Sequence, residues 1–167
     1  MAISLDPKDQ LIFALDVPDK NEAQRLVKLL QDSVGCFKVG LELFIKEGPD
    51  ILRLINDYSP ADVFLDLKLH DIPTTVRRAL RSAAILGARY ITIHSTEGDT
   101  ILETSKEVKD SGLEVLAVTF LTSMHKSQLQ ILGVEKRIKL SDLVLDRALR
   151  AQQSGCAGVI ALEKKLV

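Results

Sequence analysis

The sequence predicts an α/β protein built on a parallel β-sheet, and two features of the chain carry this prediction. Short apolar segments rich in β-branched residues recur along the 167 residues, and a helical pattern follows each of them. Apolar strands that alternate with amphipathic helices are typical of parallel sheets joined by right-handed crossovers. Since one domain commonly holds ~100–200 residues, we expect residues 1–167 to form a single domain.

Three strands are expected in the first part of the chain, at residues 11–17, 36–40 and 62–68. After the first strand, four apolar residues recur at the spacing of one helix face: Ala23, Leu26, Val27 and Leu30. After the second, Pro49 takes the first-turn position that proline favours, and an apolar helical stripe follows it. After the third, Pro73 opens a helix that Gly87 ends.

Three more strands are expected at residues 90–94, 113–120 and 157–162. Residues 101–110 are expected to be helical, whereas the stretch from about residue 122 to 140 shows no regular pattern. Ser141 is the expected N-cap of a further helix, which Gly155 ends. The chain is therefore expected to contain about six strand–helix units.

The composition excludes several classes of protein. A hydrophobic content of 46% is ample for a packed core, and a net charge of −1 lacks the basic excess of a nucleic-acid or anionic-membrane binder. No apolar run approaches the ~18 residues of a membrane-spanning helix, and the first ten residues lack the pattern of a secretory signal. Cys36 and Cys156 lie outside any metal-binding spacing, so we expect free thiols in a cytoplasmic protein without a metal site.

Two architectures fit this order of elements, an open doubly wound sheet and a (β/α)8 TIM barrel. The segment LDVPDKN follows the first strand in place of a G-x-G-x-x-G turn, which argues against a dinucleotide-binding sheet. In both architectures the ligand binds at the carboxyl ends of the strands. The polar residues at those ends are therefore the candidate site.

Charged residues gather at the expected carboxyl ends of the first three strands. Asp16 ends the first strand, Lys38 lies in the second, and Asp66 and Lys68 lie in the third, with Asp71 just beyond. Because side chains alternate along a strand, Asp66 and Lys68 are expected to share one face. A structural ion pair is one interpretation. Two acids and two bases from different strands exceed what an ion pair needs, which favours a catalytic site.

Two other signals at strand ends are weaker. His94 ends the fourth strand, and it fits a hydrogen-bonded structural residue better than a catalyst because no Ser or Cys nucleophile is evident beside it. Thr122 and Ser123 follow the fifth strand, and their hydroxyls fit either a binding site or the start of a loop.

Three segments in this order resemble the orotidine 5′-phosphate decarboxylase family: FKVGLELF at residues 37–44, FLDLKLHDIPTTV at 64–76 and VTFLTSM at 118–124. The D-x-K-x-x-D core is shared with a wider group of sugar-phosphate decarboxylases and hexulose-phosphate synthases. The continuation D-I-P-x-T, and L-T-S-M after the fifth strand, are similar to the orotidylate enzymes specifically.

The resemblance implies a homodimer of (β/α)8 barrels that converts orotidine 5′-phosphate to UMP and CO2 without metal or organic cofactor. It implies that Lys68 stabilises the carbanion and donates the proton, within a charged array completed by Lys38, Asp66 and Asp71. Asp16 would bind the ribose hydroxyls, and Asp71, Ile72 and Thr75 would reach the neighbouring subunit's site. Thr122 and Ser123 would contact the pyrimidine.

Two alternatives stay open beside this activity. One is a metal-dependent sugar-phosphate decarboxylase or aldolase of the wider group, and the other is a non-catalytic barrel remnant. A complete (β/α)8 barrel needs about 200–250 residues. Since only six strands are expected here and no counterpart of the family's phosphate-binding loops is seen, we expect the barrel domain of residues 1–167 to be incomplete at its C-terminus.

Overall fold

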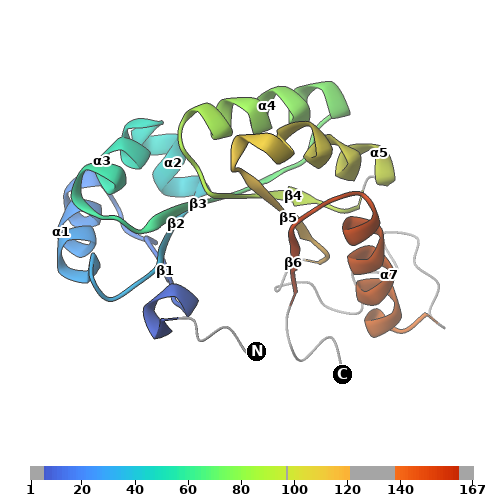
Figure 1. Cartoon of the computed structure of the whole chain (residues 1–167), viewed down its shortest axis with the longest axis horizontal. Helices are drawn as coiled ribbons and strands as arrows, with labels where there is room; N and C mark the ends of the chain where they lie inside the picture. Colours follow the sequence, from blue (N-terminus) through green and yellow to red (C-terminus); the bar gives the residue numbers. More distant parts are fainter. Residues whose placement is uncertain (1–5, 97, 121–137, 162–167) are drawn as a thin grey trace. The chain divides into compact units, whose positions relative to one another are not determined.

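The computed structural model describes residues 6–96, 98–120 and 138–161 (Figure 1). These residues form two compact units. The first holds the described residues up to Leu67 together with Leu80–Ile91 and Ser111–Leu113. The second holds Lys68–Ala79, Thr92–Asp110 and the described residues from Glu114 onward.

The strands of the described residues follow one another in the sheet in the order of the sequence, β1-β2-β3-β4-β5-β6. Pairing is parallel between β1 and β2, between β2 and β3, and between β5 and β6. A doubly wound sheet reverses its strand order at a switch point, whereas the strands of a (β/α)8 barrel follow one another around it. The unreversed order therefore belongs to the barrel class, one of the two architectures that the pattern allowed. The strand bounds are β1 Ile12–Ala14, β2 Cys36–Gly40, β3 Asp62–Leu69, β4 Tyr90–His94, β5 Glu114–Val118 and β6 Gly158–Ile160.

A short 3₁₀ helix, η1, precedes β1, and helices follow the later strands of the described residues; the α-helices are labelled in Figure 1. Their bounds are η1 Pro7–Gln10, α1 Lys20–Leu30, α2 Leu41–Glu47, α3 Asp50–Tyr58, α4 Pro73–Ile85, α5 Asp99–Leu102, η2 Glu103–Ser111 and α7 Leu140–Gln153. Strands β2 and β4 have the expected bounds, β3 is one residue longer, and the other three are shorter than expected.

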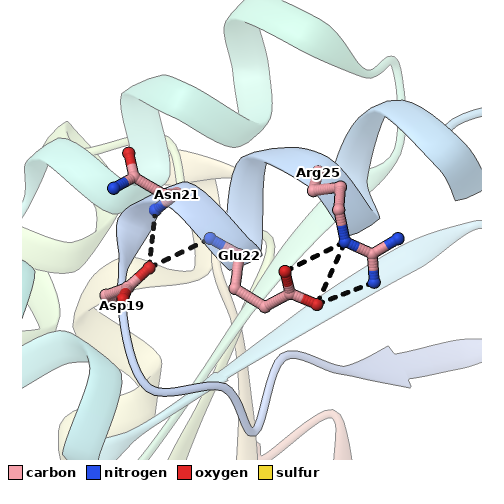
Figure 2. Close-up of polar contacts among 4 residues, drawn as sticks. All are labelled: Asp19, Asn21, Glu22 and Arg25. Carbon is pink, nitrogen blue, oxygen red and sulfur yellow. Dashed lines mark hydrogen bonds and ion pairs between the residues drawn. The ribbon is translucent and has the colours of Figure 1, made fainter.

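Helix α1 begins at a cap that its sequence encodes (Figure 2). The Asp19 carboxylate accepts hydrogen bonds from the backbone N–H groups of Asn21 and Glu22, both at 3.0 Å. These bonds satisfy two of the N–H groups that a helix start leaves unpaired. One turn on, Arg25 lies 2.7 Å from Glu22 and lowers the pKa of that carboxyl, chiefly by donating hydrogen bonds to it. The cap therefore fixes the position at which the segment after β1 ends and helix α1 begins.

Three helical segments differ from expectation. Helix α2 was not expected, because its seven residues are too short to show an apolar stripe and only Leu43 is buried. The segment expected to be helical at 101–110 is mainly a 3₁₀ helix. There the Thr104 and Ser105 hydroxyls donate to carbonyls three residues back, which competes with α-helical bonding. Ser141 is not the N-cap of α7; that position is Lys139, which makes no side-chain cap bond.

Glycine ends two helices by the same backbone motif. At the end of α4, the N–H of Gly87 bonds to Ala84 and the N–H of Ala88 bonds to Ala83. The φ of Gly87 is +79°, a left-handed conformation that side chains with a Cβ disfavour. This is the Schellman arrangement, and Gly155 repeats it after α7 with a φ of +88°. Both stops were predicted from the glycines alone.

Candidate active site

Three charged side chains meet in the first unit at the carboxyl ends of β1, β2 and β3. The Lys38 Nζ lies 3.2 Å from an Asp16 carboxylate oxygen and 3.9 Å from an Asp66 carboxylate oxygen. The register explains the second contact, since Gly40 pairs with Asp66 and residues two apart on a strand share a face. The expected convergence of these three residues is thus present in the structure.

The three groups differ in how far they are removed from water. The side chains of Lys38 and Asp66 are only 21% and 15% exposed, whereas that of Asp16 is 73% exposed. Charges held out of water need partners, so Asp66 and Lys38 stabilise each other. The outer carboxylate of Asp16 is screened by solvent and keeps oxygens free for a ligand. The array therefore has a buried half that is fixed and an exposed half that can bind.

Gly40 leaves space beside this array. A Cβ at Gly40 would lie 3.6 Å from the Lys38 Nζ and 3.7 Å from the nearest Asp16 oxygen, which is ordinary contact distance. A pocket of about 150 Å³ opens here, lined by Leu15, Asp16, Val17 and residues 40–43. A larger residue at Gly40 would fill part of that space and press on both charges.

Helix α2 ties down the segment that carries Asp16. The Lys46 ammonium donates to the Pro18 carbonyl at 2.5 Å, and a Glu47 carboxylate oxygen accepts from the Lys20 N–H at 3.1 Å. Both bonds join residues that are more than 25 positions apart in the sequence, and no local motif marks them. Sequence reasoning missed these two residues for that reason.

Lys68 lies in the second unit, and its backbone is unusual. Its φ is +49°, which makes it the one non-glycine residue with a positive φ in the described part of the chain. Its N–H donates to the hydroxyl of Thr92 on β4, at 2.8 Å. A left-handed residue interrupts the alternation of a strand. The direction of Lys68 therefore does not follow from alternation with Asp66, on which the sequence argument relied.

Asp71, Ile72 and Thr75 lie where the chain passes from β3 into α4, and all three are exposed. An Asp71 carboxylate oxygen accepts from the Ile72 N–H at 2.7 Å, and Ile72 is 67% exposed. The first two residues also line a pocket of about 440 Å³, together with His70, Pro73, Thr100 and Ile101. The second unit thus presents a carboxylate and an apolar side chain outward from the start of α4.

His94, which the sequence analysis expects to be a structural residue, contacts a second histidine, and its role stays a prediction. Its ring packs against that of His70 with the centroids 5.1 Å apart and the planes tilted by 43°. Among the residues that the structure describes, no group of three or more His, Cys, Asp or Glu side chains could hold a metal ion. In the same residues, no helix is long and apolar enough to cross a membrane.

A cation that sequence reasoning missed lies beside the residues that follow β5. The Arg147 guanidinium, on α7, lies 3.7 Å from the ring centroid of Phe120 and donates to the Thr119 carbonyl at 2.5 Å. Burial lowers the pKa of this guanidinium. Its position in an otherwise ordinary helical pattern gives no signal of these contacts. Thr122 and Ser123, the residues expected near this strand end, lie outside the described residues.

Parallel strands joined by helices, with charged residues gathered at their carboxyl ends, define a barrel-type α/β protein with a site at the strand ends. The sequence model of the orotidine 5′-phosphate decarboxylase / HUMPS family matches residues 9–166. The chain therefore belongs to this family, and the resemblance noted in its motifs is confirmed.

Individual relatives agree with this assignment. The chain is 43% identical to the orotidine 5′-phosphate decarboxylase of Desulfosudis oleivorans and 44% identical to that of Carboxydothermus hydrogenoformans. Each match covers 92% of this chain but only 63% and 65% of the respective relative. The chain thus spans somewhat less than two thirds of the length of these curated relatives.

Solved structures show the same fold. An orotidine 5′-phosphate decarboxylase from Lactobacillus acidophilus matches with a TM-score of 0.79 and 32% identity, over 90% of this chain and 70% of that one. An uncharacterized conserved protein from Geobacillus kaustophilus matches with a TM-score of 0.81 and 36% identity, over 90% and 72%. The expected fold class, α/β of the (β/α)8 barrel type with six strands in the described residues, is confirmed.

Proposed function

We propose that this protein decarboxylates orotidine 5′-phosphate to UMP. The observation that carries the proposal is the Lys38 ammonium held between Asp16 and Asp66 at the carboxyl ends of three parallel strands. Two residues beyond Asp66 lies Lys68, followed by Asp71, in a chain whose named relatives are orotidine 5′-phosphate decarboxylases. The acid–base pattern and the family therefore lead to the same reaction.

Lys68 carries the chemistry in this proposal. Breaking the bond between the pyrimidine ring and its carboxylate releases CO2 and leaves the electron pair on the ring carbon. An ammonium beside that carbon stabilises the negative charge as it develops, and then transfers a proton to the same carbon. The products are UMP and CO2, and Lys68 is left neutral until it takes up a proton from water. No metal or organic cofactor is needed for this sequence of steps.

The other charged groups prepare the site for Lys68. Asp66 holds the cations and lies close to the departing carboxylate, while Lys38 and Asp71 extend the array. Asp16, as the exposed carboxylate, binds the ribose hydroxyls.

The remaining contacts come from the rest of the chain and from a second subunit. Thr122 and Ser123 contact the pyrimidine in this proposal. The exposed side chains of Asp71, Ile72 and Thr75 reach the site of the neighbouring subunit in a homodimer. The protein acts in the cytoplasm.

An absorbance assay tests the proposal. Decarboxylation of orotidine 5′-phosphate by the purified protein, in the length in which it naturally occurs, is followed by the loss of the orotidylate absorbance. Turnover that persists in the presence of a metal chelator is expected. Turnover of a hexulose phosphate that requires a divalent metal would instead support the sugar-phosphate branch of the family. UMP binding without turnover of either substrate would contradict catalysis.

A further inference from the structure

The backbone of Lys68 is not in the extended conformation of the strand that contains it. A left-handed φ of +49° falls inside β3, whose bounds are Asp62–Leu69. Residues with a Cβ rarely adopt this region, and they keep it only where their surroundings enforce it. Something packed against Lys68 must therefore hold it there.

Thr92 is the group that meets the backbone of Lys68. Its side chain is fully buried on β4, with a relative exposure of 0%, and its hydroxyl accepts the Lys68 N–H at 2.8 Å. In a regular parallel ladder a backbone carbonyl would take this bond. A side-chain oxygen can follow an N–H that has turned away from the ladder, which a carbonyl fixed in a strand cannot.

We propose that Thr92 is a positioning residue for Lys68. Its hydroxyl holds the backbone of Lys68 in the left-handed conformation, and that conformation sets where the ammonium lies. The inference rests on the proposed function, in which Lys68 stabilises the carbanion. The hydroxyl acts only through Lys68 and touches no reacting atom.

A purely structural account of Thr92 is the competing explanation. Threonine is a good strand former, and its methyl group suits a buried position on a sheet. That account needs the shape of the side chain but not its oxygen. Valine has nearly the same shape and lacks the acceptor, so the two accounts predict different outcomes for one substitution.

The experiment compares Thr92→Val with Thr92→Ser and with a matched control, Thr104→Val. Thr104 is also buried, at 3% exposure, and its hydroxyl bonds to the backbone carbonyl of Ile101 on the helical side of the same unit. We expect Thr92→Val to lower kcat at least about tenfold while KM and the Kd of UMP change less than about threefold, because only the transition state requires the placed charge. Thr92→Ser should recover most of kcat, and Thr104→Val should change only Tm.

A crystal structure of Thr92→Val provides a readout that does not depend on activity. In Thr92→Val we expect the φ of Lys68 to leave the left-handed region. In Thr92→Ser we expect this φ to remain positive. A positive φ retained in Thr92→Val, or a kcat no lower than that of Thr104→Val, would overturn the inference. If the unaltered protein does not decarboxylate orotidine 5′-phosphate, the proposed function fails, while the structure still tests the hold of Thr92 on Lys68.

Discussion

At the scale of the residue, the two carboxylates beside the Lys38 ammonium differ in how far they are exposed to solvent. Lys38 has one largely buried carboxylate beside it and one exposed carboxylate. An exposed ion pair is worth only about 0–1 kcal/mol, so Asp16 can exchange its contact with Lys38 for one with a ligand at little cost. Asp66 is the less exposed of the two carboxylates and remains beside the ammonium, 3.9 Å away.

Replacing Lys68 tests the residue that the proposed reaction needs most. We expect Lys68→Ala to reduce kcat far below a tenth of the unaltered value, because its ammonium acts on charge that exists only in the transition state. The affinity for UMP, measured by titration, should change much less. Lys106→Ala is the control, since that lysine is 53% exposed and, in the described part of the chain, forms a surface ion pair with Glu103. A kcat above a tenth of the unaltered value would remove Lys68 from its central position.

The buried thiol of Cys36 predicts how stability depends on alkaline pH. Burial raises the pKa of this thiol from 9.0 to about 12. Below pH 9 the thiol is protonated in both states, so it adds no pH dependence. Between pH 9 and 12 the unfolded chain loses a proton that the folded chain keeps, so the free energy of unfolding falls as pH rises. At pH 10 this loss amounts to about 1.4 kcal/mol relative to pH 7.

Urea unfolding of the unaltered protein and of Cys36→Ala at pH 7 and pH 10 measures that loss. The variant lacks the thiol, so the stability difference between the two proteins should shrink by about 1.4 kcal/mol on going to pH 10. The cost of the smaller side chain is the same at both pH values and cancels. A difference that does not change with pH would contradict the raised pKa.

At the scale of the element, short connections hold the segment that carries Asp16. Helix α2 follows β2 without a loop, and two of its last residues bond to the segment between β1 and α1. The Asp19 cap (Figure 2) lies at this same end of the segment, between Pro18 and Lys20. At the β1 end, the Leu15 N–H donates to the Lys38 carbonyl at 2.9 Å. The segment that carries Asp16 is thus anchored at both ends, which lowers the entropy lost when a ligand binds to it.

Loosening this anchor should weaken binding more than catalysis. We expect Lys46→Met to raise KM about two- to fivefold with little change in kcat, because the bond to the Pro18 carbonyl orders a binding group and leaves the reacting groups alone. Lys46→Arg keeps a donor and should stay close to the unaltered KM. Steady-state kinetics on the three proteins provide both constants. Equal losses of kcat in Lys46→Met and Lys68→Ala would contradict the expectation that Lys46 supports binding and Lys68 supports the chemical step.

At the scale of the whole molecule, the exposed residues at the start of α4 bear on assembly. An apolar side chain that is 67% exposed, next to an exposed carboxylate, suits a surface shared between subunits. In the proposed two-fold dimer, each subunit would present the same patch to the other. The family assignment and the proposed homodimer are consistent with this arrangement.

Mixing two inactive variants tests whether the site is shared. Asp71→Ala and Lys68→Ala are each expected to be inactive, but their heterodimer contains one site with both residues intact. After equal mixing and full subunit exchange, we expect about a quarter of the unaltered activity, since half of the dimers carry one intact site of two. Exchange is verified separately with differently tagged subunits. No recovery despite exchange would show that each site is complete within one chain.

The sequence by itself determined the parallel α/β class, most of the helix and strand positions, and the convergence of Asp16, Lys38 and Asp66. The catalytic and binding roles of the site residues stay predictions. Apolar periodicity, glycine stops and charges at strand ends are local signals, and they act within a few residues. The convergence of Asp16, Lys38 and Asp66 could be predicted because parallel register brings strand ends together. The single domain over residues 1–167 stays a prediction, and Thr122 and Ser123 lie outside the described residues.

Only the tertiary structure decided the conformation of Lys68, the hold of Thr92 on it, and the contacts of Lys46 and Arg147. Each depends on partners more than twenty residues away in the sequence, across strands and helices whose spacing no local pattern encodes. The 3₁₀ course of η2 differs from these in its cause, which is local: hydroxyl bonds to carbonyls three residues back outweighed a helical pattern there. Residue type sets which bonds a side chain can make, but packing selects the one it makes, because a buried polar group must bond to whatever the fold places beside it.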